Sequence, residues 1–420
     1  MIDAILVSAS PGETRVACLD EAGQLLRLIV ERVGDGLRVG DIVLGRVIKV
    51  MSAVDAALVD VGEANPGFLG LAEARPVDRH AGRIGDFVTQ GDTLVVQVLR
   101  QAEGDKGAKL TRRPAGVAGA PDGVSPPVLL RRAPGAAMAA VAEHGGQSRC
   151  RILVDDGRIA AELRAGVPSL ADRIEVPGAS YSLFTAEGVD EQVEALLSPL
   201  VRLPGGGRIS IHETEALVAI DVDTGGAEHG GRDRTALAVN LEAAAAIARQ
   251  LTLREVGGHI VIDFVPMRSR GDRKHVLAAL RHGLDGDPRP VQLAGFTSLG
   301  LVELTRARTG PSLTCRLTAR CPSCEGGRVK APLTVALEAL RAVMVEDRAR
   351  PGAAWAIEAP AAVLSALSGN AAPARHEAEA RLGRPLSLVV REDMAADRFA
   401  VTAAAAATVE PANERKTRLR

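Results

Sequence analysis

Apolar and polar positions in residues 216–264 predict a strand, a helix and a second strand. Residues 216–222 and 259–264 are apolar runs rich in valine and isoleucine, which is typical of buried strands. Between them, residues 235–256 place leucine and alanine at spacings of three and four, the pattern of an amphipathic helix. Glycines 257 and 258 predict the end of this helix.

A strand, a helix and a strand in this order predict two parallel strands in one sheet, joined by a right-handed crossover. Asp221 and Asp223 close the first apolar run and lie two residues apart, so they share one face, about 7 Å apart along the strand. Asp263 closes the second run. Carboxylates then lie at the carboxyl ends of both strands, where open α/β sheets bind ligands. Mg²⁺ takes one or two carboxylates with waters and substrate phosphates, so the pattern predicts a magnesium site that acts on a phosphodiester.

A plainer interpretation of each aspartate is that it caps the following helix or closes a turn. The basic run after Asp263 favours the phosphate interpretation, because arginine side chains match phosphate oxygens in geometry and charge. Arg268 and Arg270 lie in this run, and Arg306 and Arg308 follow a later apolar segment. The ordinary alternative for a basic run is a solvated helix face.

The N-terminal part of the chain has the pattern of two β-rich units. Residues 1–35 alternate short apolar runs with turns, as the strands of a sheet do. Residues 39–111 contain further short strands separated by turn residues, which predicts a small β-barrel. Residues 114–127 are rich in glycine, proline and alanine and predict a linker or a surface loop.

The remaining segments predict additional α/β structure on either side of the acidic strands. Residues 151–154 have the pattern of a strand, and residues 188–200 have the pattern of a helix. A strong amphipathic helix is predicted over residues 334–348, followed by a small α/β unit that ends near Val401. Residues 402–420 are alanine-rich and then charged, which predicts a disordered tail.

Composition narrows the class of protein. A length of 420 residues suits about three domains. The net charge of −1 and the aromatic content of 2% provide no global basic field and few stacking surfaces, so nucleic-acid binding must come from local patches. No stretch approaches the roughly 20 apolar residues of a membrane span, and the N-terminus lacks a signal-peptide pattern, so a cytoplasmic location is expected.

Cys321 and Cys324 form a CPSCEGG segment that has the form of a zinc knuckle. Structural zinc takes four ligands, often all thiolates, and this segment supplies two. A second copy of the chain would complete a four-thiolate site across a dimer. The alternatives are Cys315 with a histidine of the same chain, or a redox-active cysteine pair.

The barrel region resembles an S1 domain in three segments, VGDIVLGRV at 39–47, AALVDVG at 56–62 and GFL at 67–69. S1 domains are OB-fold barrels that bind single-stranded RNA by stacking and backbone electrostatics. Phe68 is the candidate stacking residue, with an ordinary place in the barrel core as the alternative. Lys106 is the candidate phosphate contact.

With this barrel, the two acidic strands and the cysteine pair in the same order, the chain resembles the ribonuclease E/G family, and within it the ribonuclease G branch. The resemblance is densest in four segments, RLPGGGRISIHETEALVAIDVDTGG, NLEAAAAIARQLTLREVGGHIVIDF, LGLVELTRARTGPSL and CPSCEGG. It implies an endonuclease that cleaves single-stranded RNA and leaves 5′-phosphate and 3′-hydroxyl ends. It also implies Mg²⁺ held by Asp221 and Asp263, and Zn²⁺ shared between subunits by Cys321 and Cys324. The implied assembly is a homodimer, with a tetramer left open.

The fold implied by the resemblance is an α/β multidomain chain, with a ribonuclease H-like and deoxyribonuclease I-like catalytic core, an inserted S1 barrel and a small C-terminal α/β domain. The expected parts are the start of the ribonuclease H-like subdomain at 1–35, the S1 domain at 36–113, a shortened ribonuclease H-like region at 114–200, the catalytic domain at 201–320, the zinc link at 321–330, the C-terminal domain at 331–401 and the tail at 402–420.

Three departures from the family pattern qualify the implied function. Asp223 stands where the family often has an asparagine, so it is expected to orient a water or the scissile phosphate with an added charge. Leu58 stands where an aromatic residue is often found, which weakens the expected grip on RNA. The segment after residue 114 is short and residues 114–200 lack an Arg-Thr pair, so the family's 5′-monophosphate sensor is expected to be missing.

Two rival functions follow from the same residues. The first is a non-catalytic RNA-binding protein of the same fold, which intact Asp221 and Asp263 oppose. The second is a metal-dependent phosphoesterase acting on small molecules, which explains the carboxylates but leaves the barrel without a role. RNA binding without Mg²⁺-dependent cleavage separates the first rival from the nuclease. Hydrolysis of a small phosphodiester without RNA affinity would identify the second.

Overall fold

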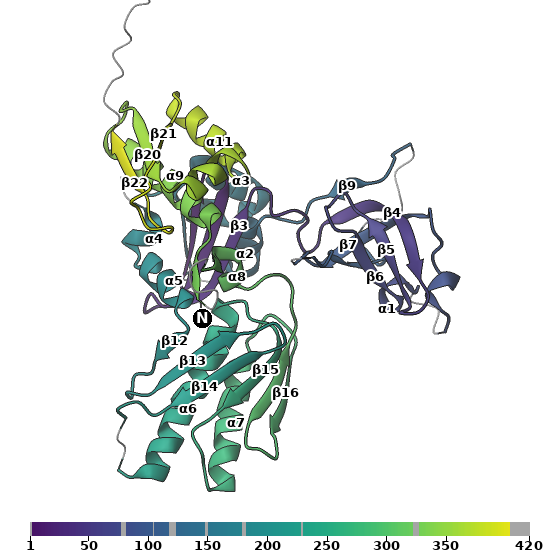
Figure 1. Cartoon of the computed structure of the whole chain (residues 1–420), viewed down its shortest axis with the longest axis vertical. Coiled ribbons are helices and arrows are strands. Elements are labelled where there is room, and N and C mark those ends of the chain that lie inside the picture. Colours follow the sequence, from purple (N-terminus) through teal and green to yellow (C-terminus); the bar gives the residue numbers. More distant parts are fainter. Residues whose placement is uncertain are drawn as a thin grey trace, which may run out of the picture. The chain divides into compact units, whose positions relative to one another are not determined.

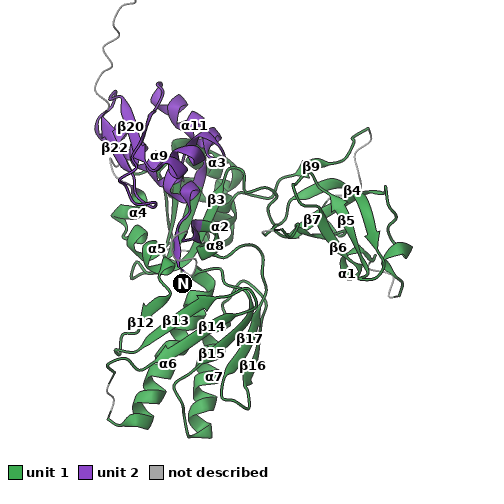
Figure 2. Ribbon diagram, in the orientation of Figure 1, with its two compact units in different colours: residues 1–8, 14–177, 183–316 green, residues 9–13, 178–182, 317–420 purple. Residues whose placement is uncertain are grey.

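The computed structural model describes residues 2–76, 81–103, 105–116, 123–147, 150–178, 182–227, 230–321 and 327–403 (Figure 1). The chain divides into two compact units, coloured separately in Figure 2. The first contains residues 1–8, 14–177 and 183–316, and the second contains residues 9–13, 178–182 and 317–420. The predicted domain boundaries are finer than this division and stay a prediction.

A five-stranded sheet with the order β11-β10-β1-β2-β3 contains the N-terminal strands. Strands β1, β2 and β3 precede the barrel in the chain, and β10 and β11 follow it. The two parts form one sheet through the parallel pairing of β10 with β1. Helices α2 and α3 cover one face, where Val141 and Leu163 pack against Ile5 and Val7. The elements of this region are β1 (Ala4–Ser10), β2 (Glu13–Leu19), β3 (Leu25–Arg32), α2 (Ala136–His144), β10 (Arg151–Val154), α3 (Gly157–Gly166), η2 (Pro168–Arg173), β11 (Ile174–Glu175), α4 (Leu183–Ala186) and α5 (Val189–Leu197). The strands predicted within residues 1–35 and 151–154 are confirmed.

The predicted barrel is confirmed as five strands that close on themselves, because β4 pairs with both β7 and β5. Alternate residues of each strand, such as Val43, Val59 and Val96, are buried in its core. One further strand, β9, pairs with β4 outside the closed barrel. The elements are β4 (Ile42–Met51), β5 (Ala56–Asp60), β6 (Gly67–Gly70), α1 (Leu71–Ala74), η1 (Ile84–Asp86), β7 (Thr93–Arg100), β8 (Lys109–Thr111) and β9 (Val128–Arg131).

A six-stranded sheet with the order β12-β13-β14-β15-β17-β16 carries the acidic strands. Helices α6 and α7 cover one face, where Ile247 and Leu280 pack against Ile220 and Ile262. The predicted parallel pairing of the two acidic strands is confirmed, since β14 and β15 are parallel neighbours. The elements are β12 (Leu200–Arg202), β13 (Arg208–Glu213), β14 (Val218–Asp223), α6 (Arg232–Leu253), β15 (Gly258–Asp263), α7 (Arg270–Leu284), β16 (Val291–Phe296), β17 (Val302–Arg306) and α8 (Leu313–Leu317).

The helix between the acidic strands ends earlier than predicted, and the predicted glycines do not end it. The apolar pattern extends it to residue 256, but α6 stops at Leu253, and Glu255 takes a left-handed conformation with φ 54°. The glycines that follow serve another purpose. A Cβ atom on Gly258 would lie 2.7 Å from Nε of Arg308, so glycine makes room for that side chain. The predicted helix over residues 188–200 is also too long, because α5 ends at Leu197 and β12 begins at Leu200.

The second unit contains a two-stranded hairpin and a small α/β domain. The domain has a three-stranded sheet with the order β21-β20-β22, and Trp355 and Leu340 lie in its core. The amphipathic helix predicted over 334–348 is confirmed as α9. The elements are β18 (Thr318–Arg320), β19 (Arg328–Lys330), α9 (Pro332–Ala349), β20 (Trp355–Ala359), α10 (Ala361–Ser368), α11 (Ala372–Leu382), β21 (Ser387–Val390) and β22 (Ala400–Ala403). Residues 402 and 403 belong to β22, and the rest of the predicted tail, 404–420, lies outside the described residues.

The observed architecture is therefore a multidomain mixture of helices and sheets with an inserted five-stranded barrel, as predicted. The finer assignment of the two sheets to ribonuclease H-like and deoxyribonuclease I-like folds stays a prediction. In the described part of the chain, none of the helices has the length and apolar character needed to cross a membrane.

Candidate functional site

Asp221 and Asp263 lie directly opposite each other on the parallel strands β14 and β15. Paired residues on neighbouring strands are about 4.8 Å apart and point to the same side of a sheet. Both side chains are exposed, while their sequence neighbours Ile220 and Ile262 are buried under the helices. The two carboxylates therefore lie side by side on the face that α6 and α7 leave open.

This pair suits a hard divalent cation. Two adjacent carboxylates would repel each other in water, and a shared cation removes that repulsion. The described residues contain no group of three or more His, Cys, Asp or Glu side chains able to hold a metal. Two carboxylates with open positions around them match Mg²⁺, which keeps several waters and takes the remaining ligands from substrate phosphates.

Asp223 lies on the same face but is held by the protein. Its Oδ1 accepts the N–H of Gly225 at 2.6 Å, and its Oδ2 accepts from Arg208 at 2.9 Å. The Gly225 N–H, followed by the Arg208 hydrogen bond, lowers the pKa of Asp223. Arg208 is its register partner on β13, so the extra charge that Asp223 introduces is matched by a cation on the neighbouring strand.

The backbone after Asp263 is fixed by Asn240, a residue that the sequence reasoning missed. Asn240 is fully buried in α6, donates from Nδ2 to the carbonyl oxygen of Val265 at 2.8 Å, and accepts the Val265 N–H at 3.0 Å. These two bonds clamp the chain two residues beyond Asp263. A signal was present in the sequence, because Asn240 is a polar residue on the apolar stripe that includes Leu237 and Ala244.

Asn240→Ala should lower RNA cleavage by about 10- to 100-fold, the usual effect of losing a residue that orients a metal ligand. RNA affinity in EDTA should stay unchanged, because the Asn240 side chain is fully buried. Asn240→Asp should be intermediate, since it still accepts the Val265 N–H but no longer donates to the carbonyl. Single-turnover cleavage and equilibrium binding measure the two effects. Equal losses of binding and cleavage would contradict a positioning role.

The predicted cations after Asp263 divide into two groups. Arg268 and Arg270 are exposed at the start of α7, and within the described residues neither makes an ion pair or side-chain hydrogen bond. Ser269 caps this helix by accepting the N–H groups of Gly271 and Asp272, which sets the course of the basic segment. Both arginines therefore remain available to an anion beside the acidic pair.

The prediction that Arg306 helps to bind phosphate is wrong. Its side chain is 1% exposed, pairs with Asp287 at 2.7 Å and donates to the carbonyl oxygen of Val256. It also lies at the wrong end of the sheet, because its β17 position pairs with Gly258, the first residue of β15. Arg308 donates to the carbonyl oxygen of Gly257 at the same end. The apolar run before these arginines could not reveal which end of β15 they would meet.

The barrel presents one continuous row of candidate RNA contacts. Register pairs join Lys49 to Leu58, Leu58 to Phe68, and Phe68 to Lys109, so four strands place these side chains on one outer face. Phe68 is 38% exposed, which argues against a place in the barrel core. The exposed Lys106 lies three residues before Lys109, in a turn closed by Glu103. Sequence reasoning found Phe68 and Lys106 but missed Lys49 and Lys109, whose place in the row depends on register.

The cysteines fall into distinct environments. Cys321 directly follows β18, and its N–H donates to the carbonyl oxygen of Gly327 across the hairpin. Cys324, the second predicted zinc ligand, lies outside the described residues. Cys18 and Cys150 are buried, and burial raises the pKa of Cys18 to about 12 and the pKa of Cys150 above its ordinary value. These two thiols are core residues and unsuited to metal binding.

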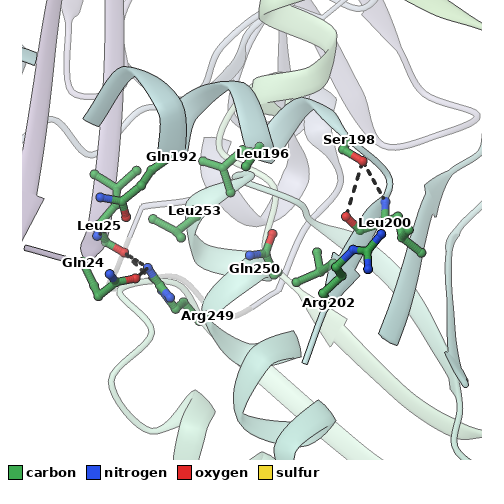
Figure 3. Close-up of a pocket in the computed structure, with 12 residues that line it drawn as sticks. Gln24, Leu25, Gln192, Leu196, Ser198, Leu200, Arg202, Arg249, Gln250 and Leu253 are labelled. Atoms are coloured by element: carbon green, nitrogen blue, oxygen red, sulfur yellow. Dashed lines mark hydrogen bonds between the residues drawn. The ribbon is translucent and has the colours of Figure 1, made fainter. Parts of the chain in front are cut away.

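A cavity of about 430 Å³ lies where β3 and α5 meet β12 and α6, and its lining does not include Asp221 or Asp263 (Figure 3). Most of its polar groups bond to the protein itself. Arg249 donates to the carbonyl oxygen of Leu25 at 2.9 Å, and the N–H of Leu25 donates to Gln192 at 2.8 Å. These bonds hold β3 of the five-stranded sheet against α6, which covers the six-stranded sheet. The cavity therefore belongs to the packing between the two sheets. Arg202 also lines it, but has no side-chain partner among the described residues.

Comparison with known proteins agrees with this arrangement. The model of the ribonuclease E/G family matches residues 114–309. Ribonuclease G of Salmonella typhimurium (strain SL1344) is 30% identical over 481 residues, which cover 92% of this chain and 96% of that protein. The chain belongs to the ribonuclease E/G family. Ribonuclease G of Haemophilus influenzae is 29% identical, with 81% of this chain and 87% of that protein covered. Ribonuclease E of Escherichia coli (strain K12) is 28% identical, with 82% of this chain but 40% of that protein covered.

The comparisons confirm the predicted family and the homology to endoribonucleases. They also show a difference in length within the aligned region. The alignment with the Salmonella ribonuclease G extends over 481 residues, although the chain has 420, so that relative carries segments that this chain lacks. The expected loss of the sensor segment from residues 114–200 stays a prediction.

Proposed function

We propose that this protein is a Mg²⁺-dependent endoribonuclease that cleaves single-stranded RNA and acts in RNA processing and decay in the cytoplasm. The observation that carries this proposal is the register pairing of Asp221 with Asp263 on the open face of the sheet. Family membership supports the nuclease class, and the barrel row supports an RNA substrate.

In the proposed mechanism, Asp221 and Asp263 would hold Mg²⁺, which would supply an activated water and stabilise the charge on the phosphodiester. Arg268 and Arg270 bind phosphate oxygens beside this pair and offset its negative charge. Asn240 keeps the backbone after Asp263 in place. Hydrolysis breaks the bond between phosphorus and the 3′-oxygen. The water oxygen then stays on the 5′-phosphate of one fragment, and the other fragment keeps a 3′-hydroxyl.

Asp223 has a supporting role in this proposal. Its bonds to Gly225 and Arg208 fix its position and lower its pKa. We propose that Asp223 orients a water or the scissile phosphate. The family often has an asparagine at this position. Because Arg208 neutralises it, Asp223 adds little net charge to the metal site.

The test uses a single-stranded, AU-rich RNA with a 5′ label, incubated with Mg²⁺ or with EDTA. Internal cuts that require Mg²⁺ support the proposal, and analysis of the fragment ends should show 5′-phosphate and 3′-hydroxyl groups. The same RNA with a 5′-monophosphate or a 5′-hydroxyl should be cut at equal rates, because residues 114–200 lack the Arg-Thr pair of the sensor. Absence of any cleavage would contradict the proposal.

Phe68→Ala should weaken RNA binding by about 5- to 100-fold, the usual loss when one base loses its stacking partner. Leu58→Phe should strengthen binding, because Leu58 is adjacent to Phe68 in the same row. Val54→Ala is the matched control, since Val54 is 65% exposed on the barrel at the turn after β4. Fluorescence anisotropy in EDTA measures all three. Equal affinities for Phe68→Ala and Val54→Ala would contradict the proposed RNA face.

The zinc site is proposed as a link between two copies of the chain. Cys321 and Cys324 of one chain would supply two thiolates, and a second copy would supply the other two, which gives the four ligands of a structural site. Zinc content and mass in solution test it together. Half a zinc ion per chain in a dimer supports the link, and a zinc-free dimer contradicts it.

The second candidate function is RNA binding without efficient cleavage. Leu58 favours it, because an aliphatic residue in the middle of the RNA-binding row departs from the family pattern of a processing enzyme. RNA bound with unchanged length in Mg²⁺ would support this candidate over the nuclease.

A further inference from the structure

A second hollow lies on the β12–β13 side of the six-stranded sheet that carries the acidic pair. It has a volume of about 420 Å³ and lies between the turn that joins β12 to β13 and the loop after β14. Its charged lining residues are Arg202 and Arg208, and the rest of its lining is Leu200, Leu203 and glycines 206, 207, 225 and 226. The lining of the hollow is therefore basic, with two arginines and no acidic side chain.

Close backbone packing shapes the floor of this hollow. The N–H of Gly226 donates to the carbonyl oxygen of Gly206 at 3.3 Å. A Cβ atom on Gly225 would lie 2.5 Å from the same oxygen, so only glycine permits the two loops to approach this closely. The N–H groups of Gly206 and Gly225 are also bonded within the protein. The floor thus offers few free donors, and the arginines dominate the chemistry of the hollow.

The two arginines form a like-charged pair that the protein only partly neutralises. Arg202 and Arg208 are register partners on the antiparallel strands β12 and β13, and like charges in that relation destabilise a sheet. Asp223 pairs with Arg208 at 2.9 Å. Arg202 is exposed and has no ion pair or side-chain hydrogen bond in the described part of the chain. One positive charge therefore remains uncompensated beside the site.

The position of this charge fits a bound polynucleotide. Arg208 is opposite Asp223, which is two residues and about 7 Å along β14 from Asp221. Arg268 and Arg270 lie at the start of α7, which follows Asp263 along the chain and packs against β16, at the opposite edge of the sheet from β12. Cations thus flank the acidic pair on both sides along the carboxyl edge of the sheet. An extended phosphate backbone that crosses this edge would meet cations before and after the acidic pair.

We propose that Arg202 and Arg208 form a subsite for an RNA phosphate next to the one being cleaved. Arg202 supplies the principal contact, and Arg208 is held in place by Asp223 and offers its remaining N–H groups. The proposal rests on the nuclease function above and adds to it a second anchoring point for the substrate. The fixed guanidinium geometry would set the register of the strand over Asp221 and Asp263.

The salt dependence of RNA binding in EDTA tests the subsite without cleavage. Removal of one phosphate contact lowers the slope of log affinity against log salt by about 0.7 for a single strand. Arg202→Ala should show this smaller slope, with an affinity about three- to tenfold lower at low salt. Arg202→Lys should keep the slope, because it keeps the charge. Arg281→Ala is the matched control, since Arg281 is an exposed arginine in the last turn of α7, at the far end of that helix from Arg270.

A neutral linkage in the RNA locates the contact. A single methylphosphonate is placed at the linkage on either side of the cut site. For the wild type, kcat/KM should fall when it is on one of these sides and not on the other. The same change should have no effect on Arg202→Ala, whose contact is already lost. Equal losses for wild type and variant at every position, or an Arg202→Ala salt slope equal to that of Arg281→Ala, would overturn the subsite while leaving the nuclease proposal intact. Absence of RNA binding by the wild type would overturn both.

Discussion

Asp263→Asn should reduce Mg²⁺-dependent RNA cleavage by roughly 1,000-fold, the upper range for losing a group that stabilises charge in the reaction. The amide keeps the size of the side chain but removes the charge that holds the cation beside Asp221. RNA affinity in EDTA should stay the same or rise slightly, because the substitution removes one negative charge that would repel the RNA phosphates. Single-turnover cleavage of a labelled RNA measures the effect.

The matched control is Asp285→Asn. Asp285 is an exposed carboxylate at the end of α7, at the far end of that helix from the basic segment. Its loss should leave cleavage within about twofold of the wild type, as expected of a surface change remote from the site. Cleavage by Asp263→Asn at the rate of this control would show that the acidic pair is not the reaction centre.

Arg306→Met should lower the free energy of unfolding by about 3–5 kcal/mol, the cost of leaving a buried ion-pair partner alone. Arg306 and Asp287 are each 1% exposed and share two hydrogen bonds, at 2.7 and 2.9 Å. The double variant Arg306→Met with Asp287→Leu should regain most of the loss, since it leaves no unpaired charge. Urea unfolding of the three proteins measures this. A single-variant loss below about 1 kcal/mol would place the pair in the class of surface ion pairs.

The same pair predicts the sign of a pH effect. Burial alone would raise the pKa of Asp287, but hydrogen bonds from Arg306 and from the Arg289 N–H hold that pKa below its ordinary value. A lowered folded-state pKa contributes stability above the unfolded pKa, about 3.9, and that stability is lost as the pH falls through the folded value. In Arg306→Met the unpaired carboxyl should gain a proton at mildly acidic pH. The gap in stability between wild type and Arg306→Met should therefore narrow as the pH falls.

The central arrangement of the site follows from local sequence. The apolar runs that end at Asp221 and Asp263 predict strands, and the helical pattern between them requires the strands to be parallel. Parallel neighbours with acidic ends bring those ends to one edge, so the pairing of the two carboxylates is predictable from sequence alone. The barrel follows in the same way from strand alternation and turn residues, whereas local sequence left a place in the barrel core open for Phe68, which the structure shows exposed.

Other features depend on contacts between residues that no local pattern relates. Arg208 pairs with Asp223 only because β13 and β14 adopt one particular register. Register likewise adds Lys109 to the row that contains Phe68. Local sequence wrongly predicts a phosphate role for Arg306, because its buried partner Asp287 lies 19 residues earlier in the chain and only the fold brings the two together. In each case the local sequence specifies the side chain, and tertiary packing decides what it meets.

The most direct test of the account is single-turnover RNA cleavage as a function of Mg²⁺ concentration for four proteins: the wild type, Asp221→Asn, Asp263→Asn and the double variant. If the two carboxylates share one cation, each single variant should lose nearly all activity. The double variant should then be no less active than either single variant, because the effects of residues that act as a unit are not additive. Losses that multiply in the double variant would mean that the carboxylates act independently. Cleavage that persists in either single variant would contradict the shared metal site.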